Sequence, residues 1–219
     1  MYIIYMEIYI SIDGVLRNTI QKFKYHYTES FLSPDSIIDE NDTFDYALFE
    51  PITNDNLLDC FRFQSKEQFE FFYYIEYPLE IFGHAGLSHK DTMSRLNELI
   101  SLNKEHNFTI VGLNEFGKAK PATLFFLSKN GFMGNNIKFI KSEDIKNEWE
   151  KCDYWVTDSK EIIDSCPKEK TVVKFNTPYN EYFTNSKEIN KLQEINETWM
   201  KSLVEPTTLT LTQSQKDVE

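Results

Sequence analysis

Basic residues are scarce in this 219-residue chain. Its 23 lysines and arginines stand against 35 aspartates and glutamates, which gives a formal net charge of −12, and arginine occurs only at Arg17, Arg62 and Arg95. So acidic a chain repels phosphate backbones and anionic lipid headgroups unless it has a local basic face. We therefore expect no direct nucleic-acid binding and no membrane binding, and we look to other proteins as partners.

Cysteine and long apolar runs are also lacking. Cys60, Cys152 and Cys166 are widely spaced and form no C-x-x-C pair, which excludes a zinc ribbon and a disulfide framework and favours reduced thiols in an intracellular protein. No apolar run approaches the roughly 20 residues that span a bilayer. The apolar start, Met1 to Ile10, carries Glu7 and no basic residue, so it predicts a strand rather than a signal peptide. We expect a cytoplasmic or virion-associated protein.

Aromatic residues, in contrast, are abundant. The chain has 18 phenylalanines and 12 tyrosines, and it is rich in lysine and asparagine but poor in arginine. That bias favours residues with AT-rich codons and hints at a phage or an AT-rich bacterium. Hydrophobic residues make up 41% and charged residues 26%, which is ordinary for a globular protein.

Short apolar segments alternate with helix-like segments through most of the chain. This alternation predicts βαβ units, and hence a three-layer, Rossmann-like α/β fold around a parallel sheet. The predicted strands are Glu7–Ser11, Phe108–Leu113, Ile137–Ile140, Tyr154–Thr157 and Thr171–Phe175. The predicted helices cover His89–Asn107, Pro121–Asn130, Ser142–Lys151, Ser159–Cys166 and Ser186–Leu203.

Residues 18–87 interrupt this pattern and predict a cap-like insertion after the first strand. Their apolar residues show no clean period, so helix and strand remain open there. The stretch from Phe69 to Tyr77 reads FEFFYYIEY and is expected to form the core of the insertion, with an exposed protein-binding patch as the alternative. Residues 1–17 and 88–203 would form the α/β core. Residues 204–219 are a polar tail that we expect to be disordered unless a partner orders it.

Polar residues follow the predicted strands at their carboxyl ends, where open α/β sheets bind ligands. Ser11 and Asp13 end the first strand, and Asn114 and Asp158 follow two others. Each has a plainer interpretation. Asp13 and Gly14 suit a tight turn, Asp158 suits the cap of the next helix, Asn114 suits an ordinary loop, and Ser11 has no local sign of nucleophilicity.

The segment EIYISIDGVL, from Glu7 to Leu16, resembles the first motif of the haloacid dehalogenase superfamily, an apolar strand followed by D-x-D-G. WVTDSKEIID from Trp155 resembles its acidic fourth motif, and VKFNTPYN from Val173 is similar to a segment of the 5'-deoxyribonucleotidase-like branch. The resemblance covers residues 1–17 and about 88–203 and implies phosphoryl transfer through an aspartyl-phosphate, assisted by Mg²⁺.

Laid on this family, Asp13 takes the place of the general acid and base, while Ser11 stands where the family has its nucleophilic aspartate. The phosphate-binding Ser or Thr position falls on Leu113 or Asn114, of which Asn114 could hydrogen-bond a phosphate, and either Lys120 or Lys141 matches the phosphate-binding lysine. A serine carries no charge for Mg²⁺, and no histidine lies near the predicted strand ends to activate it. The resemblance thus implies a fold whose catalytic residues are lost, with Ser11, Asp13, Asn114 and Asp158 as remnants.

We therefore expect a non-catalytic, structural or interaction protein with no cofactor and no metal. A phage virion component, such as a ring or connector at the portal, neck or tail, is one specific form. The alternative is a Mg²⁺-dependent phosphatase or nucleotidase with an altered site, in which Asp13 and Asp158 hold the metal. A weaker third possibility is phosphate or nucleotide sensing through Asn114 and a lysine.

Overall fold

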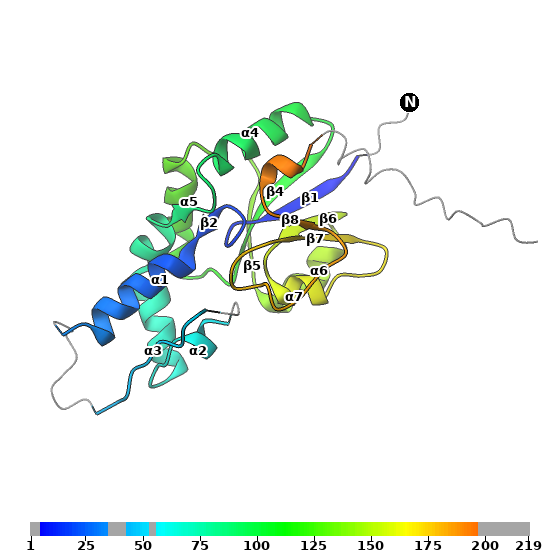
Figure 1. The fold of residues 1–219 in the computed structure, drawn as a ribbon. Helices are drawn as coiled ribbons and strands as arrows, with labels where there is room; N and C mark the ends of the chain where they lie inside the picture. The colour runs from blue at the N-terminus through cyan, green and yellow to red at the C-terminus, as the bar shows by residue number, and fades with distance from the viewer. Residues whose placement is uncertain (1–4, 35–42, 53–55, 197–219) are drawn as a thin grey trace, which may run out of the picture.

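In the computed structural model, which describes residues 5–34, 43–52 and 56–196, a six-stranded parallel sheet forms the centre of the chain (Figure 1). Its order is β5-β4-β1-β6-β7-β8. The strands are β1 (Glu7–Ser11), β4 (Asn107–Leu113), β5 (Ile137–Ile140), β6 (Tyr154–Thr157), β7 (Thr171–Phe175) and β8 (Glu188–Ile189). The predicted α/β class is confirmed.

Two helical layers cover the sheet because its strands are apolar on both faces. Ile8 and Ile10 of β1 pack against α4 (Thr92–Leu102) and α5 (Ala119–Lys129). Tyr9 points to the opposite face, where α6 (Ile145–Trp149) and α7 (Lys160–Asp164) cover it. Strands buried on both sides are typical of parallel sheets between helices.

The strand order reverses at β1. The chain runs outward from β1 through β4 to β5, then returns to the other side of β1 as β6. In open α/β sheets the crevice outside the carboxyl ends of the strands at such a switch point is the usual ligand site. Ser11 ends β1 at this edge, between β4 and β6.

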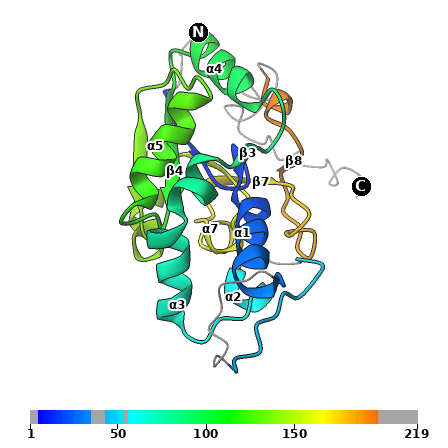
Figure 2. The ribbon, with the colours of Figure 1, turned by 90° about the vertical axis from the view of Figure 1, so that its left-hand side faces the viewer.

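The insertion is mainly helical and lies beyond the carboxyl edge of the sheet, where Figures 1 and 2 show its helices in blue and cyan. Arg17–Asn18 (β2) and Gly86–Leu87 (β3) pair antiparallel where it leaves and rejoins the core. Its helices are α1 (Thr19–Tyr27), α2 (Leu57–Cys60) and α3 (Lys66–Phe71). The wide π-helical turns η1 (Thr28–Leu32), η2 (Phe72–Glu76) and η3 (Leu79–Gly83) complete it.

An aromatic cluster holds the insertion together. The ring of Phe23 lies 4.7 Å from Phe61, 5.4 Å from Phe72 and 5.2 Å from Tyr73, measured between centroids. The stretch from Phe69 to Tyr77 supplies much of this cluster, as predicted. Ala119 and Ala122 of α5 belong to the same cluster, so a core helix forms one wall of the insertion.

The last predicted helix is wrong over its described part. Within residues 186–196 the structure has β8 and a 3₁₀ turn, η5 (Leu192–Glu194), instead of a continuous helix. Ile189, Leu192 and Ile195 pack into the main core, and β8 adds a strand that was not predicted. The rest of that predicted helix and the tail from residue 204 lie outside the described residues.

The segment Ser142–Lys151 also departs from its prediction. It starts as a 3₁₀ turn, η4 (Ser142–Asp144), before α6, and Ser142 does not cap it. The three cysteines are free thiols, as expected. Among the described residues, no helix combines the length and apolar character needed to cross a bilayer.

Candidate functional site

Three of the four predicted site residues meet in one cavity. Asp13, Asn114 and Asp158 line a space of about 250 Å³, here called the crevice, at the carboxyl edge of the sheet. The insertion supplies most of the opposite wall, which is rich in aromatic rings. The crevice residues from the insertion are Thr19, Ile20, Asn56, Leu57, Phe69, Tyr73, Tyr74 and Phe82.

Ser11 does not line the crevice. Its hydroxyl donates to Thr157 Oγ1 at 2.8 Å and accepts from Trp155 Nε1 at 3.1 Å. Both partners are fully buried, and Ser11 itself is buried with them. The structure therefore places Ser11 inside the packing between β1 and β6, facing the layer of α6 and α7.

Arg17 holds Asp13 in a two-pronged ion pair. Its Nε lies 2.7 Å from Oδ1 and its Nη2 lies 3.1 Å from Oδ2, while Thr19 donates to Oδ1 at 3.0 Å. A guanidinium is planar and permanently charged, so this arrangement fits a carboxylate well. The crevice carboxylate that would hold a metal or move a proton already has a cation beside it.

The remaining donors of Arg17 tie the insertion to the core. Nη2 donates to Glu115 Oε1 at 2.7 Å, and Nη1 donates to Thr123 Oγ1 at 2.5 Å and to the carbonyl oxygen of Phe82 at 3.4 Å. A guanidinium has five N–H groups, and all five have an acceptor here. Its plane also faces the ring of Phe82, with Cζ 4.9 Å from the centroid. Arg17 is completely buried.

The neighbouring charges and the burial of Arg17 and Glu115 shift the pKa values of both groups. Burial alone lowers the pKa of Arg17, but Asp13 and Glu115 raise it by more, so the guanidinium stays charged. Burial raises the pKa of Glu115 to about 7, against the opposing effect of Arg17. The hydroxyl of Thr123 donates to the second oxygen of Glu115. Near neutral pH, Glu115 is therefore poised between its charged and neutral forms.

Asp158 lies against Gly14, and the hydroxyl of Tyr179 donates to it. Gly14 has φ +69°, and a Cβ on it would overlap the carboxyl group of Asp158, so glycine is needed twice over. Burial, with the nearby Asp158, raises the pKa of Tyr179 well above its usual range, so its hydroxyl keeps its proton. Ser159, not Asp158, is the cap residue of α7.

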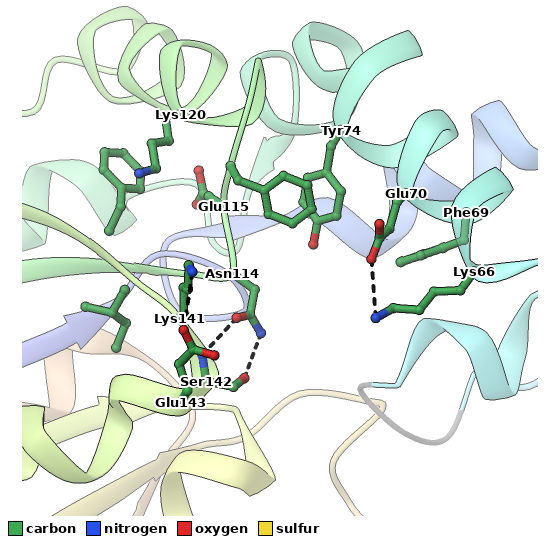
Figure 3. Close-up of a pocket in the computed structure, with 13 residues that line it drawn as sticks. Lys66, Phe69, Glu70, Tyr74, Asn114, Glu115, Lys120, Lys141, Ser142 and Glu143 are labelled. Atoms are coloured by element: carbon green, nitrogen blue, oxygen red, sulfur yellow. Dashed lines mark hydrogen bonds and ion pairs between the residues drawn. The ribbon is translucent and has the colours of Figure 1, made fainter.

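Asn114 links the loop after β4 to the loop after β5 through hydrogen bonds. It has φ 54°, and its amide donates to Ser142 Oγ at 2.8 Å while its carbonyl oxygen accepts from the Ser142 backbone at 2.9 Å (Figure 3). Ser142 Oγ donates in turn to Glu161 at 2.7 Å. Asn114 thus joins the ends of β4 and β5, and its amide is engaged in the structure itself.

Lys120 and Lys141, the two candidates for a phosphate-binding lysine, line a larger neighbouring cavity of about 660 Å³, shown in Figure 3. Lys141 pairs with Glu143 at 3.3 Å, and the ammonium of Lys120 lies 5.6 Å from the ring centroid of Phe139. Neither lysine lines the crevice itself. The larger cavity shares Phe69, Tyr74 and Asn114 with the crevice, so the two spaces adjoin.

One histidine lies nearer to a strand end than the sequence suggested. His89 stacks obliquely on Phe175, the last residue of β7, at 5.9 Å, and its Nε2 lies 2.8 Å from the carbonyl oxygen of Asn190. Among the described residues, His89 forms no hydrogen bond and no ring contact with Ser11. Within the same residues, no group of three or more histidine, cysteine or acidic side chains is arranged to hold a metal ion.

The residues that dominate the site were not predicted. Arg17, Glu115 and Tyr179 contact the crevice acids or one another, yet none was singled out from the sequence. Only Arg17 gave a usable signal, because it is one of three arginines and follows Asp13 by four residues. Glu115 directly follows Asn114, at the end of a buried strand, which is a weaker hint.

Fold and crevice together define a Rossmann-like α/β protein whose switch-point crevice is acidic and walled by an aromatic insertion. A scan against protein-family models found no match, and a search of the curated proteins found no relative.

Proposed function

We propose that this chain is a non-catalytic, haloacid-dehalogenase-like interaction protein that binds other proteins through its insertion and crevice. The observation that carries the proposal is the ion pair between Arg17 and Asp13. A fixed positive charge 2.7 Å from the crevice carboxylate repels a second, divalent cation and competes for its oxygens. Metal binding at Asp13 would have to disrupt a guanidinium whose five donors are all satisfied.

Ser11 adds independent support. Its hydroxyl is fixed between Trp155 and Thr157 and is not on the crevice surface. A nucleophile needs both an activating base and access to the reacting atom. Its two polar partners, an indole N–H and a hydroxyl, provide no such base.

The insertion offers surface for contacts. Tyr25, Phe49 and Phe71 are each more than half exposed although the insertion has its own packed core. Exposed aromatic side chains are enriched in protein interfaces, and the net charge of −12 favours a basic partner. A phage virion component is the specific form of this proposal that the bias toward residues with AT-rich codons supports. Mass spectrometry of purified phage particles tests it, and absence of the protein from them would rule it out.

The test of lost catalysis is an assay with a generic phosphate monoester and Mg²⁺. We expect no release of phosphate above a heat-inactivated sample, from either the parent protein or Asp13→Asn. Mg²⁺-dependent turnover that Asp13→Asn abolishes would establish the phosphatase alternative instead.

A second, more specific test replaces Ser11 by aspartate, the residue that the haloacid dehalogenase superfamily uses as its nucleophile. Ser11→Asp puts a carboxylate between two buried side chains, so we expect loss of stability without gain of activity, because the position does not reach the crevice. Ser11→Ala is the matched control for the lost hydroxyl. Turnover appearing in Ser11→Asp would contradict the placement of this residue.

A further inference from the structure

We propose that the larger cavity beside the crevice binds a small aromatic carboxylate, a planar ring that carries one negative charge. This inference goes beyond the proposed function and does not rest on it. The cavity measures about 660 Å³, within the roughly 300–1,000 Å³ of small-molecule sites. Its described walls come from the ends of β4 and β5 and the start of α5 on one side, and from α3 and η2 of the insertion on the other.

A hydroxyl without a protein partner faces this cavity. Tyr74 is only 8% exposed, yet among the described residues no group hydrogen-bonds its hydroxyl. Figure 3 shows the hydroxyl pointing into the cavity. Burial, together with the charges of Asp13 and Glu115, raises the pKa of Tyr74 well above its usual range, so the hydroxyl keeps its proton near neutral pH and can donate it to an acceptor. An oxygen of a ligand would satisfy this donor.

Lys120 supplies a positive charge that no acidic side chain of the described chain balances. It forms no ion pair with those residues, and its ammonium lies 5.6 Å from the ring centroid of Phe139. The cavity therefore favours a ligand with one negative charge. The other charged side chains of its described wall have partners of opposite sign, namely Lys66 with Glu70 at 3.4 Å, Lys141 with Glu143 at 3.3 Å and Glu115 with Arg17 at 2.7 Å.

The acidic side chains of the wall favour a carboxylate over a phosphate. Glu70 and Glu143 would repel the second negative charge of a phosphate monoester, and Lys120 alone would not balance both charges. A carboxylate carries a single charge and has two acceptor oxygens. One oxygen can accept from the hydroxyl of Tyr74, and the flexible chain of Lys120 can bring its ammonium to the other.

Aromatic rings form the apolar part of the wall. The ring centroids of Tyr74 and Phe116 are 3.9 Å apart, and Phe69 meets Tyr74 edge-on at 6.5 Å. Phe116 is nevertheless exposed, directly after the end of β4. A flat ring in the cavity would cover it, and ring pairs contribute more than their buried area alone. The wall thus favours an aromatic body on the carboxylate.

The experiment is calorimetric titration of the full chain at pH 8, without Mg²⁺, with four probes. Phenylacetate has both the ring and the single charge, phenylacetamide is its neutral isostere, acetate lacks the ring, and phenyl phosphate carries about two charges. We expect saturable binding of phenylacetate. Each of the other probes should bind at least about tenfold more weakly, because it lacks one of the favourable contacts or adds a repulsion.

Tyr74→Phe tests the unpartnered hydroxyl. It should weaken the binding of phenylacetate at least about tenfold, because it removes a donor to a charged acceptor and leaves the ring in place. Its thermal midpoint should stay close to that of the parent protein, since the hydroxyl has no partner among the described residues. Tyr25→Phe is the matched control, because Tyr25 is an exposed tyrosine of α1 outside the cavity wall.

Two charge variants with opposite signs test the role of the lysines. Lys120→Gln should weaken the binding of phenylacetate at least about tenfold, whereas Lys129→Gln, at the far end of α5 and outside the cavity wall, should bind like the parent protein. Glu70→Gln releases Lys66 from its ion pair and should tighten binding.

The inference is overturned if phenylacetate does not bind, if phenylacetamide or phenyl phosphate binds as tightly, or if Tyr74→Phe binds like the parent protein. Weaker binding to Glu70→Gln than to the parent would also overturn it. These results are heats of binding, whereas the proposed loss of catalysis is measured as phosphate release, so either proposal can fail without the other.

Discussion

Replacing Glu115 by glutamine should remove a pH dependence of stability that this one carboxyl group creates. Its pKa is raised to about 7 in the folded protein by burial, from an ordinary value of 4.5. Between these two values the unfolded chain has released the proton and the folded protein still holds it. The free energy of unfolding contributed by Glu115 is therefore full below pH 4.5 and is lost as pH rises through about 7.

The size of the effect follows from the shift. One pKa unit corresponds to about 1.4 kcal/mol, so a shift from 4.5 to about 7 makes the loss about 3 kcal/mol over that interval. Glu115→Gln keeps the shape of the side chain and cannot titrate. Its free energy of unfolding should therefore fall less than that of the parent protein as pH rises from 5 to 8.

The assay is urea unfolding followed by circular dichroism at pH 5, 6, 7 and 8, with the difference between variant and parent plotted against pH. Glu143→Gln is the matched control, since it removes a carboxylate from a side chain that is 73% exposed in the neighbouring cavity. A difference between Glu115→Gln and the parent that stays constant with pH would refute the reasoning.

Two further substitutions test the geometry of the crevice. Arg17→Met should cost about 3–5 kcal/mol in urea unfolding because it leaves the buried Glu115 and the half-buried Asp13 without their cation, whereas Arg95→Met, on the exposed face of α4, should cost under about 1 kcal/mol. Equal losses from both would show that the buried ion pair contributes no more than a surface one. Gly14→Ala should lower the thermal midpoint clearly more than Gly131→Ala. Both glycines have positive φ, but only at Gly14 does a Cβ meet another group, the carboxyl of Asp158. Matching midpoints would mean that Asp158 moves aside at little cost.

The core of the fold was predictable because its signals are local. Each strand of the parallel sheet is a short apolar run, and Gly131 with φ +75° marks the end of α5 where the sequence placed it. Strand β8 has only two residues, too few for any periodicity, and the apolar residues around it resemble a helix. Ile189 and Leu192 instead pack against the sheet, and this tertiary contact decides their conformation.

The candidate site was predictable only in part. Asp13, Asn114 and Asp158 follow strands, and the parallel topology alone brings them to one edge. The orientation of Ser11 depends on the packing of Trp155, which no local pattern encodes. The role of Arg17 depends on partners 65, 98 and 106 positions away in the sequence, so that only the folded chain brings them together.

Helix α5 has a consequence for how this chain can be divided or can evolve. One part of it, Ala119 and Ala122, belongs to the aromatic cluster of the insertion, and another, Phe126 and Leu127, belongs to the core of the sheet. Deleting residues 18–87 would therefore strip an apolar flank from a helix that the sheet also needs. Because the two parts share this helix, we expect them to unfold together and neither to be a module that recombination could transplant intact.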